Sequence, residues 1–167
     1  MVAGGSGLAP MRALLQQREY DAKRALQQQD EEVHDSKRND NTAATNVLFF
    51  GCKNKGVDYI YREELEAYQA RGVLTALHTA FSRDGPSKVY VQGLMTECGT
   101  AETLASLLLN EGAYVYVCGA TAMGSDVMTA FSKVLQRYKG WTEAEAAECL
   151  KSMVDSKRYV RELWTAS

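Results

Sequence analysis

The sequence lacks the patterns of metal-binding and membrane-spanning proteins. It has only two histidines, and none of its four cysteines forms a CxxC pair, so we expect no metal site. Scattered unpaired thiols are typical of a reducing compartment. No apolar run approaches the roughly 20 residues of a membrane helix, and no secretory signal is visible. The sequence therefore predicts a soluble, cytoplasmic protein.

A strong charge of one sign is also missing. The 19 basic and 21 acidic residues give a formal net charge of −2, so we do not expect general nucleic-acid binding. The length of 167 residues, with 46% hydrophobic and 24% charged residues, is typical of a single globular domain with a substantial core. We therefore treat 1–167 as one domain.

Alternating strand and helix patterns predict an α/β protein. Short runs rich in β-branched and aromatic residues predict strands over Met1–Val2, Asn46–Cys52, Val73–Phe81, Ala113–Cys118 and Lys157–Trp164. Helices are expected over Pro10–Gln29, Tyr61–Arg71, Lys88–Glu97, Thr100–Asn110, Ala122–Tyr138 and from Thr142 to Asp155. This order predicts a Rossmann-like, doubly wound parallel sheet of five strands with helices on both faces. The polar stretch Asp30–Thr45 is interpreted as a flexible insertion.

A glycine-rich turn precedes the first expected helix, which presents Met11, Leu14 and Leu15 as apolar positions. Such a turn places backbone N–H groups and the positive helix end where a pyrophosphate can bind. Gly5 and Gly7 fit the first two glycines of G-x-G-x-x-G, but Pro10 occupies the third position, so the motif alone is weak. The strand before the turn is reduced to two residues, and we expect the chain to be a fragment of a longer protein.

The loop after the third expected strand carries the clearest site pattern. Its functional side chains are Ser82, Arg83, Lys88, Tyr90 and Gln92. Open α/β sheets bind ligands at the carboxyl ends of their strands, where this loop begins. Arg83 can hold a phosphate with its planar guanidinium, and Lys88 adds a point charge. A solvated surface loop is the alternative interpretation, and Asp84 is an alternative acceptor for the ribose hydroxyl of NAD.

Several motifs occur in the order found in one known family. They are GGSGLAP, FFGCKNKGVDYIYREEL, FSRDGPSKVYVQ, YVCG and RYVRELW. Over almost its whole length the chain resembles the C-terminal, NADPH-binding domain of the diflavin reductases, and within that family the NADPH–cytochrome P-450 reductases. The resemblance implies the NADP-binding fold of the ferredoxin–NADP reductase type.

The resemblance also implies a set of cofactor contacts for NADP(H). They are Ser6, Ser82, Arg83, Lys88, Val89, Tyr90, Val91, Gln92, Asp126 and Trp164. Within this set, Ser82, Arg83 and Lys88 would hold the 2′-phosphate. Tyr90 would pack on the adenine, and Ser6 would lie near the nicotinamide end.

Three residues are implied in the hydride-transfer step, namely Cys118, Glu162 and Trp164. Cys118 would orient the nicotinamide ring without acting as a nucleophile, although a cysteine that ends a buried strand is more usually core filler. Glu162 would act with this cysteine at a position where the most similar reductases have Asp. Trp164 would stack on the FAD ring, with a buried terminal tryptophan as the alternative.

By the same resemblance the parent enzyme passes a hydride from NADPH to FAD and single electrons through FMN to a haem protein. Its FAD and FMN domains would lie upstream, so this chain alone is expected to bind NADP(H) without turnover. Alternatives within the class are a sulfite reductase flavoprotein, a nitric oxide synthase-type reductase and a ferredoxin–NADP reductase. A stand-alone NADPH-binding module is the alternative from another class. Anchoring of the parent on the cytoplasmic face of the endoplasmic reticulum also stays open.

The chain departs from the family pattern at three places. The polar stretch Asp30–Thr45 is longer than the resemblance leads us to expect. Ala120 follows Cys118-Gly119 where the family usually has Asp, and the turn there is one residue shorter. Three residues also follow Trp164, whereas the typical reductase ends at or just beyond this position.

Overall fold

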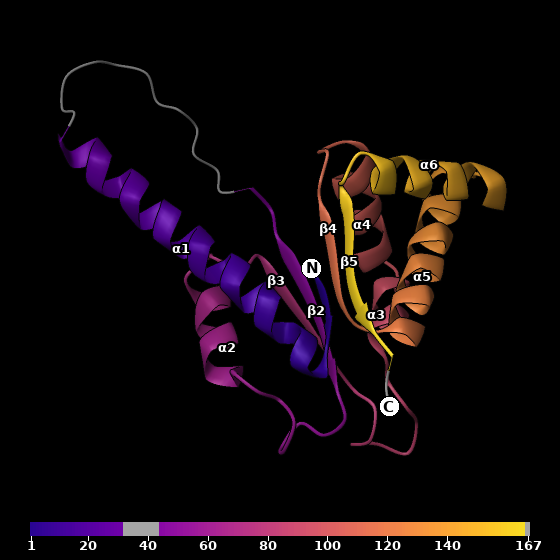
Figure 1. Ribbon diagram of the computed structural model, residues 1–167, viewed down its shortest axis with the longest axis horizontal. Helices are drawn as coiled ribbons and strands as arrows, with labels where there is room; N and C mark the ends of the chain where they lie inside the picture. Colours follow the sequence, from indigo (N-terminus) through magenta and orange to yellow (C-terminus); the bar gives the residue numbers. More distant parts are fainter. Residues whose placement is uncertain (32–43, 166–167) are drawn as a thin grey trace.

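The computed structural model describes residues 1–31 and 44–165 and contains one five-stranded parallel sheet (Figure 1). The strands are β1 (Val2–Gly4), β2 (Val47–Cys52), β3 (Ala76–Phe81), β4 (Val115–Ala120) and β5 (Tyr159–Trp164). Their order across the sheet is β3-β2-β1-β4-β5, and all four neighbouring pairs are parallel. The predicted doubly wound α/β fold is confirmed.

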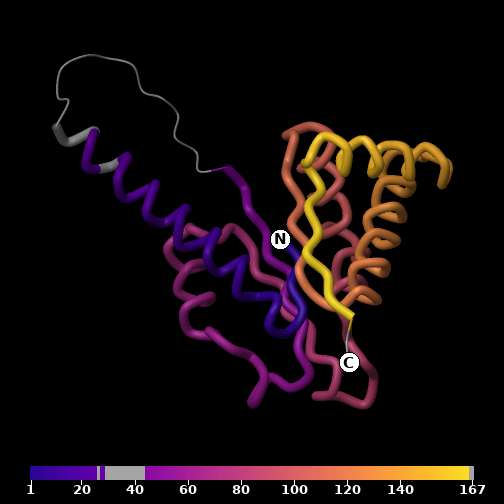
Figure 2. Tube along the Cα trace, viewed as in Figure 1, coloured from indigo at the N-terminus to yellow at the C-terminus, as the bar shows by residue number. Residues whose placement is uncertain are grey.

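Helices cover both faces of the sheet (Figure 2). One face carries α1 (Leu8–Glu31), which follows the 3₁₀ turn η1 (Gly5–Gly7), and α2 (Arg62–Ala70). The other face carries α3 (Val91–Met95), α4 (Thr100–Leu109), α5 (Thr121–Lys139) and α6 (Glu143–Asp155). Because parallel strands are joined by right-handed crossovers, the helices between β1 and β3 lie on one face, and the helices that follow β3 lie on the other.

The hydrophobic core forms two layers, one on each side of the sheet. On β2, Leu48 and Phe50 pack on the α1–α2 side with Leu65, whereas Phe49 packs on the opposite side with Phe131. These side chains are at most 2% exposed. Alternate residues of a strand point to opposite faces, so a strand buried on both sides is apolar throughout.

Some predicted boundaries were wrong. The helix expected over Lys88–Glu97 is confined to α3, and Tyr90 before it is extended, with φ −124° and ψ 154°. Leu14, one of the apolar positions of the first expected helix, is 40% exposed. Pro10 is tolerated in the first turn of α1, where its missing N–H has no partner to lose. Most of the insertion predicted over Asp30–Thr45 lies outside the described residues, but α1 includes the first two positions of that stretch.

Candidate functional site

The carboxyl ends of the five strands meet at one edge of the sheet, at the bottom of Figure 1. The glycine turn follows β1 there, and the loops beginning at Lys53 and Ser82 follow β2 and β3. Neighbouring strands lie about 4.8 Å apart, so the end of β3 is about 19 Å from the end of β5. An elongated ligand can therefore contact both ends of this edge across the glycine turn.

The glycine turn packs directly on the end of β4. A Cβ atom at Gly7 would lie 2.1 Å from the carbonyl oxygen of Cys118, so only glycine fits this position. Gly5 has a φ of +54°, a conformation that glycine adopts without strain. Between them Ser6 is exposed at the edge, where the resemblance expects it. The close approach positions Ser6 near the end of β4.

Met123 of α5 lies beside the turn, a contact that no sequence pattern revealed. A Cβ at Gly4 would lie 2.7 Å from its Sδ, and a Cβ at Gly119 would lie 2.5 Å from its Cε. The thioether therefore packs against Gly4, the last residue of β1, and against Gly119, near the end of β4. Flexible methionine side chains commonly fill irregular spaces of this kind.

The loop after β3 presents its cationic side chains to solvent. Arg83 and Lys88 are exposed, and within the described part of the chain neither forms an ion pair. Val89 and Tyr90 are 42% and 47% exposed. Ser82 is half-buried, and its Oγ donates to the carbonyl oxygen of Cys52 at 3.4 Å. The unpaired charges favour an anionic ligand.

Val91 differs from its neighbours because its side chain belongs to the core. It is 2% exposed, and its Cγ1 would lie 3.1 Å from a Cβ at Gly51 on β2. A cofactor contact by Val91 would therefore use its backbone.

Gln92 and Asp126 are brought together from separate elements. The Nε2 of Gln92 on α3 donates to the Oδ2 of Asp126 on α5 at 3.1 Å. Both line a groove of about 500 Å³ together with Thr96, Lys133 and Arg137. The two cations were not singled out from the sequence, because exposed helical Lys and Arg carry no distinctive local pattern.

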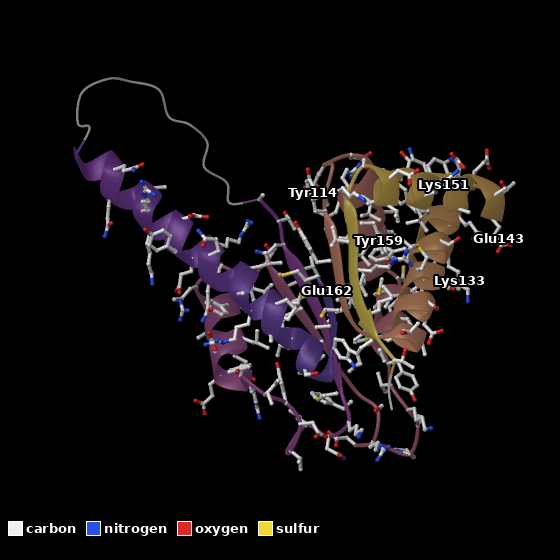
Figure 3. All side chains as sticks on the ribbon, in the orientation of Figure 1. Tyr114, Lys133, Glu143, Lys151, Tyr159 and Glu162 are labelled. Atoms are coloured by element: carbon white, nitrogen blue, oxygen red, sulfur yellow. The ribbon has the colours of Figure 1, made fainter. Side chains whose placement is uncertain are left out.

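Cys118 and Glu162 are register partners in the parallel pair of β4 and β5. Side chains of register partners lie on the same face of the sheet. Figure 3 labels Glu162 and Tyr159 on opposite sides of β5, with Tyr159 on the α5 side. Cys118 is 5% exposed. Burial raises the pKa of its thiol, and the Glu162 carboxylate raises that pKa further. The thiol is therefore held in its protonated form.

Trp164 is the last residue of β5 and is 39% exposed. It pairs in register with Ala120, after which β4 passes directly into α5. The Oγ1 of Thr121, the first residue of α5, donates to the carbonyl oxygen of Trp164 at 3.1 Å. This contact fixes the end of β5, and sequence reasoning had missed it. The exposure argues against the buried-tryptophan alternative.

The predicted residues thus form two groups at one sheet edge. Ser6, Cys118, Glu162 and Trp164 lie at the ends of β1, β4 and β5, and the residues of 82–92 lie at and beyond the end of β3. Among the described residues, no cluster of metal-ligating side chains occurs. No helix in the same part of the chain is both long and apolar enough to cross a bilayer.

The similarity of this chain to known proteins extends over almost its whole length. A family model described as oxidoreductase NAD-binding domain matches residues 1–129. The chain is 35% identical over 166 residues to NADPH–cytochrome P450 reductase of Sus scrofa, and equally to that of Bos taurus. It is 39% identical over 166 residues to bifunctional cytochrome P450/NADPH–P450 reductase 1 of Bacillus subtilis. These alignments cover 98–99% of this chain but 22%, 22% and 14% of the three relatives.

Proposed function

Because this chain belongs to the family of oxidoreductase NAD-binding domains, we propose that it is the NADP(H)-binding domain of a diflavin reductase of the NADPH–cytochrome P450 reductase type. The observation that carries the proposal is the arrangement of one sheet edge. Exposed Arg83 and Lys88 lie beyond the end of β3, and the register pair Cys118–Glu162 lies near the ends of β4 and β5. A 2′-phosphorylated dinucleotide matches this edge, with its phosphate at one end and its nicotinamide at the other.

The described side chains fit NADP(H) better than NAD(H). A 2′-phosphate carries roughly −1.5 to −2 charges near neutral pH, like other phosphomonoesters. Arg83 and Lys88 offer two cations to it, and Ser82 lies at the start of the same loop. Tyr90 offers an exposed ring to the adenine, and the Gln92–Asp126 pair adds polar groups beside it. Val89 contributes an exposed apolar surface and Val91 its backbone.

At the other end, the chain's residues orient the reacting ring. The Cys118 thiol is buried and protonated, so it acts as a small polarisable surface and not as a nucleophile. Glu162 lies beside it in the sheet, and Ser6 faces the same edge from the glycine turn. Trp164 presents an exposed ring for stacking on FAD. When bound, NADPH would supply a hydride to the FAD of the complete enzyme.

The wider activity follows from this assignment. The chain spans about a fifth of the length of its reductase relatives from Sus scrofa and Bos taurus. We infer that 1–167 is one NADP(H)-binding domain of a larger cytoplasmic flavoprotein, in which FAD- and FMN-binding domains carry electrons to a haem protein.

A chimeric enzyme tests the electron-transfer role. The chain replaces the corresponding C-terminal portion of the Sus scrofa reductase, and NADPH-dependent reduction of cytochrome c is measured, with NADH as the comparison. We expect turnover with NADPH and far less with NADH. A correctly folded, flavin-loaded chimera that binds NADP⁺ but reduces nothing would instead favour a stand-alone NADPH-binding module.

A further inference from the structure

The loops that follow β2 and β3 are joined beyond the end of the sheet. The parallel ladder of these strands ends with the register pair Cys52 and Phe81. Past this point the Ser82 N–H still donates to the Cys52 oxygen at 3.0 Å, and the Arg83 N–H donates to the Lys53 oxygen at 2.9 Å. The backbone at the start of the cationic loop therefore stays paired with the backbone of the loop after β2.

Side chains continue the connection where the backbone pairing stops. The Nδ2 of Asn54 donates to the carbonyl oxygen of Arg83 at 3.3 Å and to the Oδ1 of Asp84 at 3.1 Å. The backbone N–H of Lys55 donates to the other carboxylate oxygen, Oδ2 of Asp84, at 2.8 Å. Both oxygens of Asp84 are thus bonded to the loop after β2.

Asn54 is itself fixed within its own loop. Its backbone N–H donates to the Oδ2 of Asp58 at 2.8 Å, and the backbone N–H of Asp58 donates to the Asn54 oxygen at 2.8 Å. The backbone of Asn54 therefore lies in a closed turn, from which its side-chain amide reaches Asp84.

The position of the Asp84 charge matters because Arg83 precedes it directly. A carboxylate at this edge can accept a hydrogen bond from the ribose 2′-hydroxyl of NAD, as acidic residues do in NAD sites. It can also pair with a neighbouring guanidinium and repel a 2′-phosphate. Hydrogen bonds to an amide and to a backbone N–H hold the Asp84 carboxylate on the loop after β2, away from both of these roles.

We propose that Asn54 and Asp84 are positioning residues for cofactor discrimination: their hydrogen bonds fasten the Asp84 carboxylate to the loop after β2 and leave Arg83 free to bind the 2′-phosphate. The inference rests on the proposed function, because it concerns the choice between NADP(H) and NAD(H) at the same edge. In an NAD site the acid binds the ribose hydroxyl of the cofactor, whereas here Asp84 would be held away from the cofactor.

The test is a calorimetric titration of the whole chain with NADP⁺ and with NAD⁺, which differ only in the 2′-phosphate. Asn54→Asp replaces the amide donor with a second carboxylate and so releases Asp84. We expect the preference for NADP⁺ over NAD⁺ to fall about tenfold, the equivalent of one charge-assisted hydrogen bond. Asn54→Ala, which adds no charge, should shift the preference in the same direction.

The decisive variant combines Asn54→Asp with Asp84→Asn. It has the net charge of the wild type and restores the amide-to-carboxylate bond with donor and acceptor exchanged, while the new amide oxygen can still accept from the Lys55 N–H. We expect it to recover most of the NADP⁺ preference. Asn110→Asp is the matched control, because it places the same change on exposed Asn110 at the end of α4.

Each outcome has a distinct meaning. If the two-site variant stays as impaired as Asn54→Asp, the carboxylate at position 54 and not the loss of the tether lowers the preference, and the proposal fails. If both nucleotides weaken in proportion and the melting temperature falls, Asn54 is only structural, and the proposal fails as well. A wild-type chain that binds neither nucleotide, or that prefers NAD⁺, contradicts the proposed function itself.

Discussion

Cys118 of β4 stands in register with Glu162 of β5, on the same face of the sheet. The carboxylate contributes, after burial, to the raised pKa of the thiol. The strand pairing alone thus creates a buried, protonated thiol beside an acid. No loop needs to close to bring these two groups together, so they are preorganised before any ligand binds.

This pairing predicts the reactivity of the thiols. Iodoacetamide at pH 8.5 should label exposed Cys98 quickly and Cys118 slowly, because the thiolate is the reactive form. Glu162→Gln removes the negative charge, lowers the pKa of Cys118 and should speed its labelling relative to Cys98, as followed by mass spectrometry. Glu143→Gln on α6 is the control. Equal rates in wild type and Glu162→Gln would show that burial alone sets the pKa.

Arg83→Ala should weaken NADP⁺ binding by about 1.5–3 kcal/mol, the contribution of a hydrogen bond to a charged group. Its affinity for NAD⁺, which has no 2′-phosphate, should hardly change. Calorimetry with both nucleotides measures the two effects, with exposed Arg24 on α1 changed to alanine as the matched control. Unchanged NADP⁺ affinity in Arg83→Ala would remove this residue from the site.

Trp164→Ala should change the coenzyme preference of the complete reductase. Hydride transfer requires reacting atoms at roughly 3–3.5 Å, so a ring stacked on FAD must leave first. Such stacking contributes roughly 0.5–1.5 kcal/mol beyond area burial, and binding of the 2′-phosphate is expected to drive the displacement. Without the ring, kcat/KM should therefore rise far more for NADH than for NADPH.

Tyr138→Ala serves as the control for that measurement, since Tyr138 and Trp164 are similarly exposed, at 41% and 39%. An NADPH/NADH ratio of kcat/KM that does not fall in Trp164→Ala would make Trp164 a packing residue. Another group would then control the access of nicotinamide to FAD.

Gly7→Ala should destabilise the fold, because its Cβ would meet the Cys118 carbonyl oxygen at 2.1 Å and the obstacle is backbone. We expect a loss of about 2–3 kcal/mol and a melting temperature lower by about 4–10 °C. Gly93→Ala is the opposite case. Apart from its chain neighbours and the backbone of its own helix, nothing lies within 4 Å of the added Cβ, and Gly93 is in α3, so stability should rise by up to about 1 kcal/mol. Thermal denaturation of both variants gives the comparison.

Alkaline pH should destabilise the protein partly through Cys52. Burial is the main cause that raises the pKa of this thiol to about 11. Between about pH 9 and 11 the unfolded chain therefore releases a proton that the folded chain retains, so the free energy of unfolding falls as the pH rises. Denaturant titrations should show a shallower fall for Cys52→Ala.

Much of this structure could be predicted from sequence because it depends on local patterns. Thr142 followed three residues later by Glu145 is the sequence pattern of a capping box, and the structure contains it, with the Glu145 N–H donating to the Thr142 Oγ1 at 3.3 Å. The apolar run before Gly119 predicts a buried strand, and the alternation of strands with helices predicts parallel pairing. Parallel strands in turn place the candidate residues Ser82 and Cys118 at the same sheet edge.

The remaining features depend on contacts between distant residues. The tether between Asn54 and Asp84, the bond from Thr121 to Trp164 and the packing of Met123 on Gly4 join separate elements. No periodicity in the sequence marks such contacts. The late start of α3 has the same origin, because its first residue, Val91, packs close to Gly51 of β2 and the chain before it stays extended.

The central position of β1 has a consequence for how the protein folds. Val2 pairs with Phe49 on one side and with Val117 on the other, so the middle of the sheet joins parts of the chain that are far apart in sequence. Contacts of such high sequence separation form slowly, because loops must close before the pairing stabilises them. Local units such as α5 and α6 can form earlier. The sheet edge that carries the candidate site therefore forms only after β1 has inserted between β2 and β4. Nucleotide can bind only once this last step of sheet formation is complete.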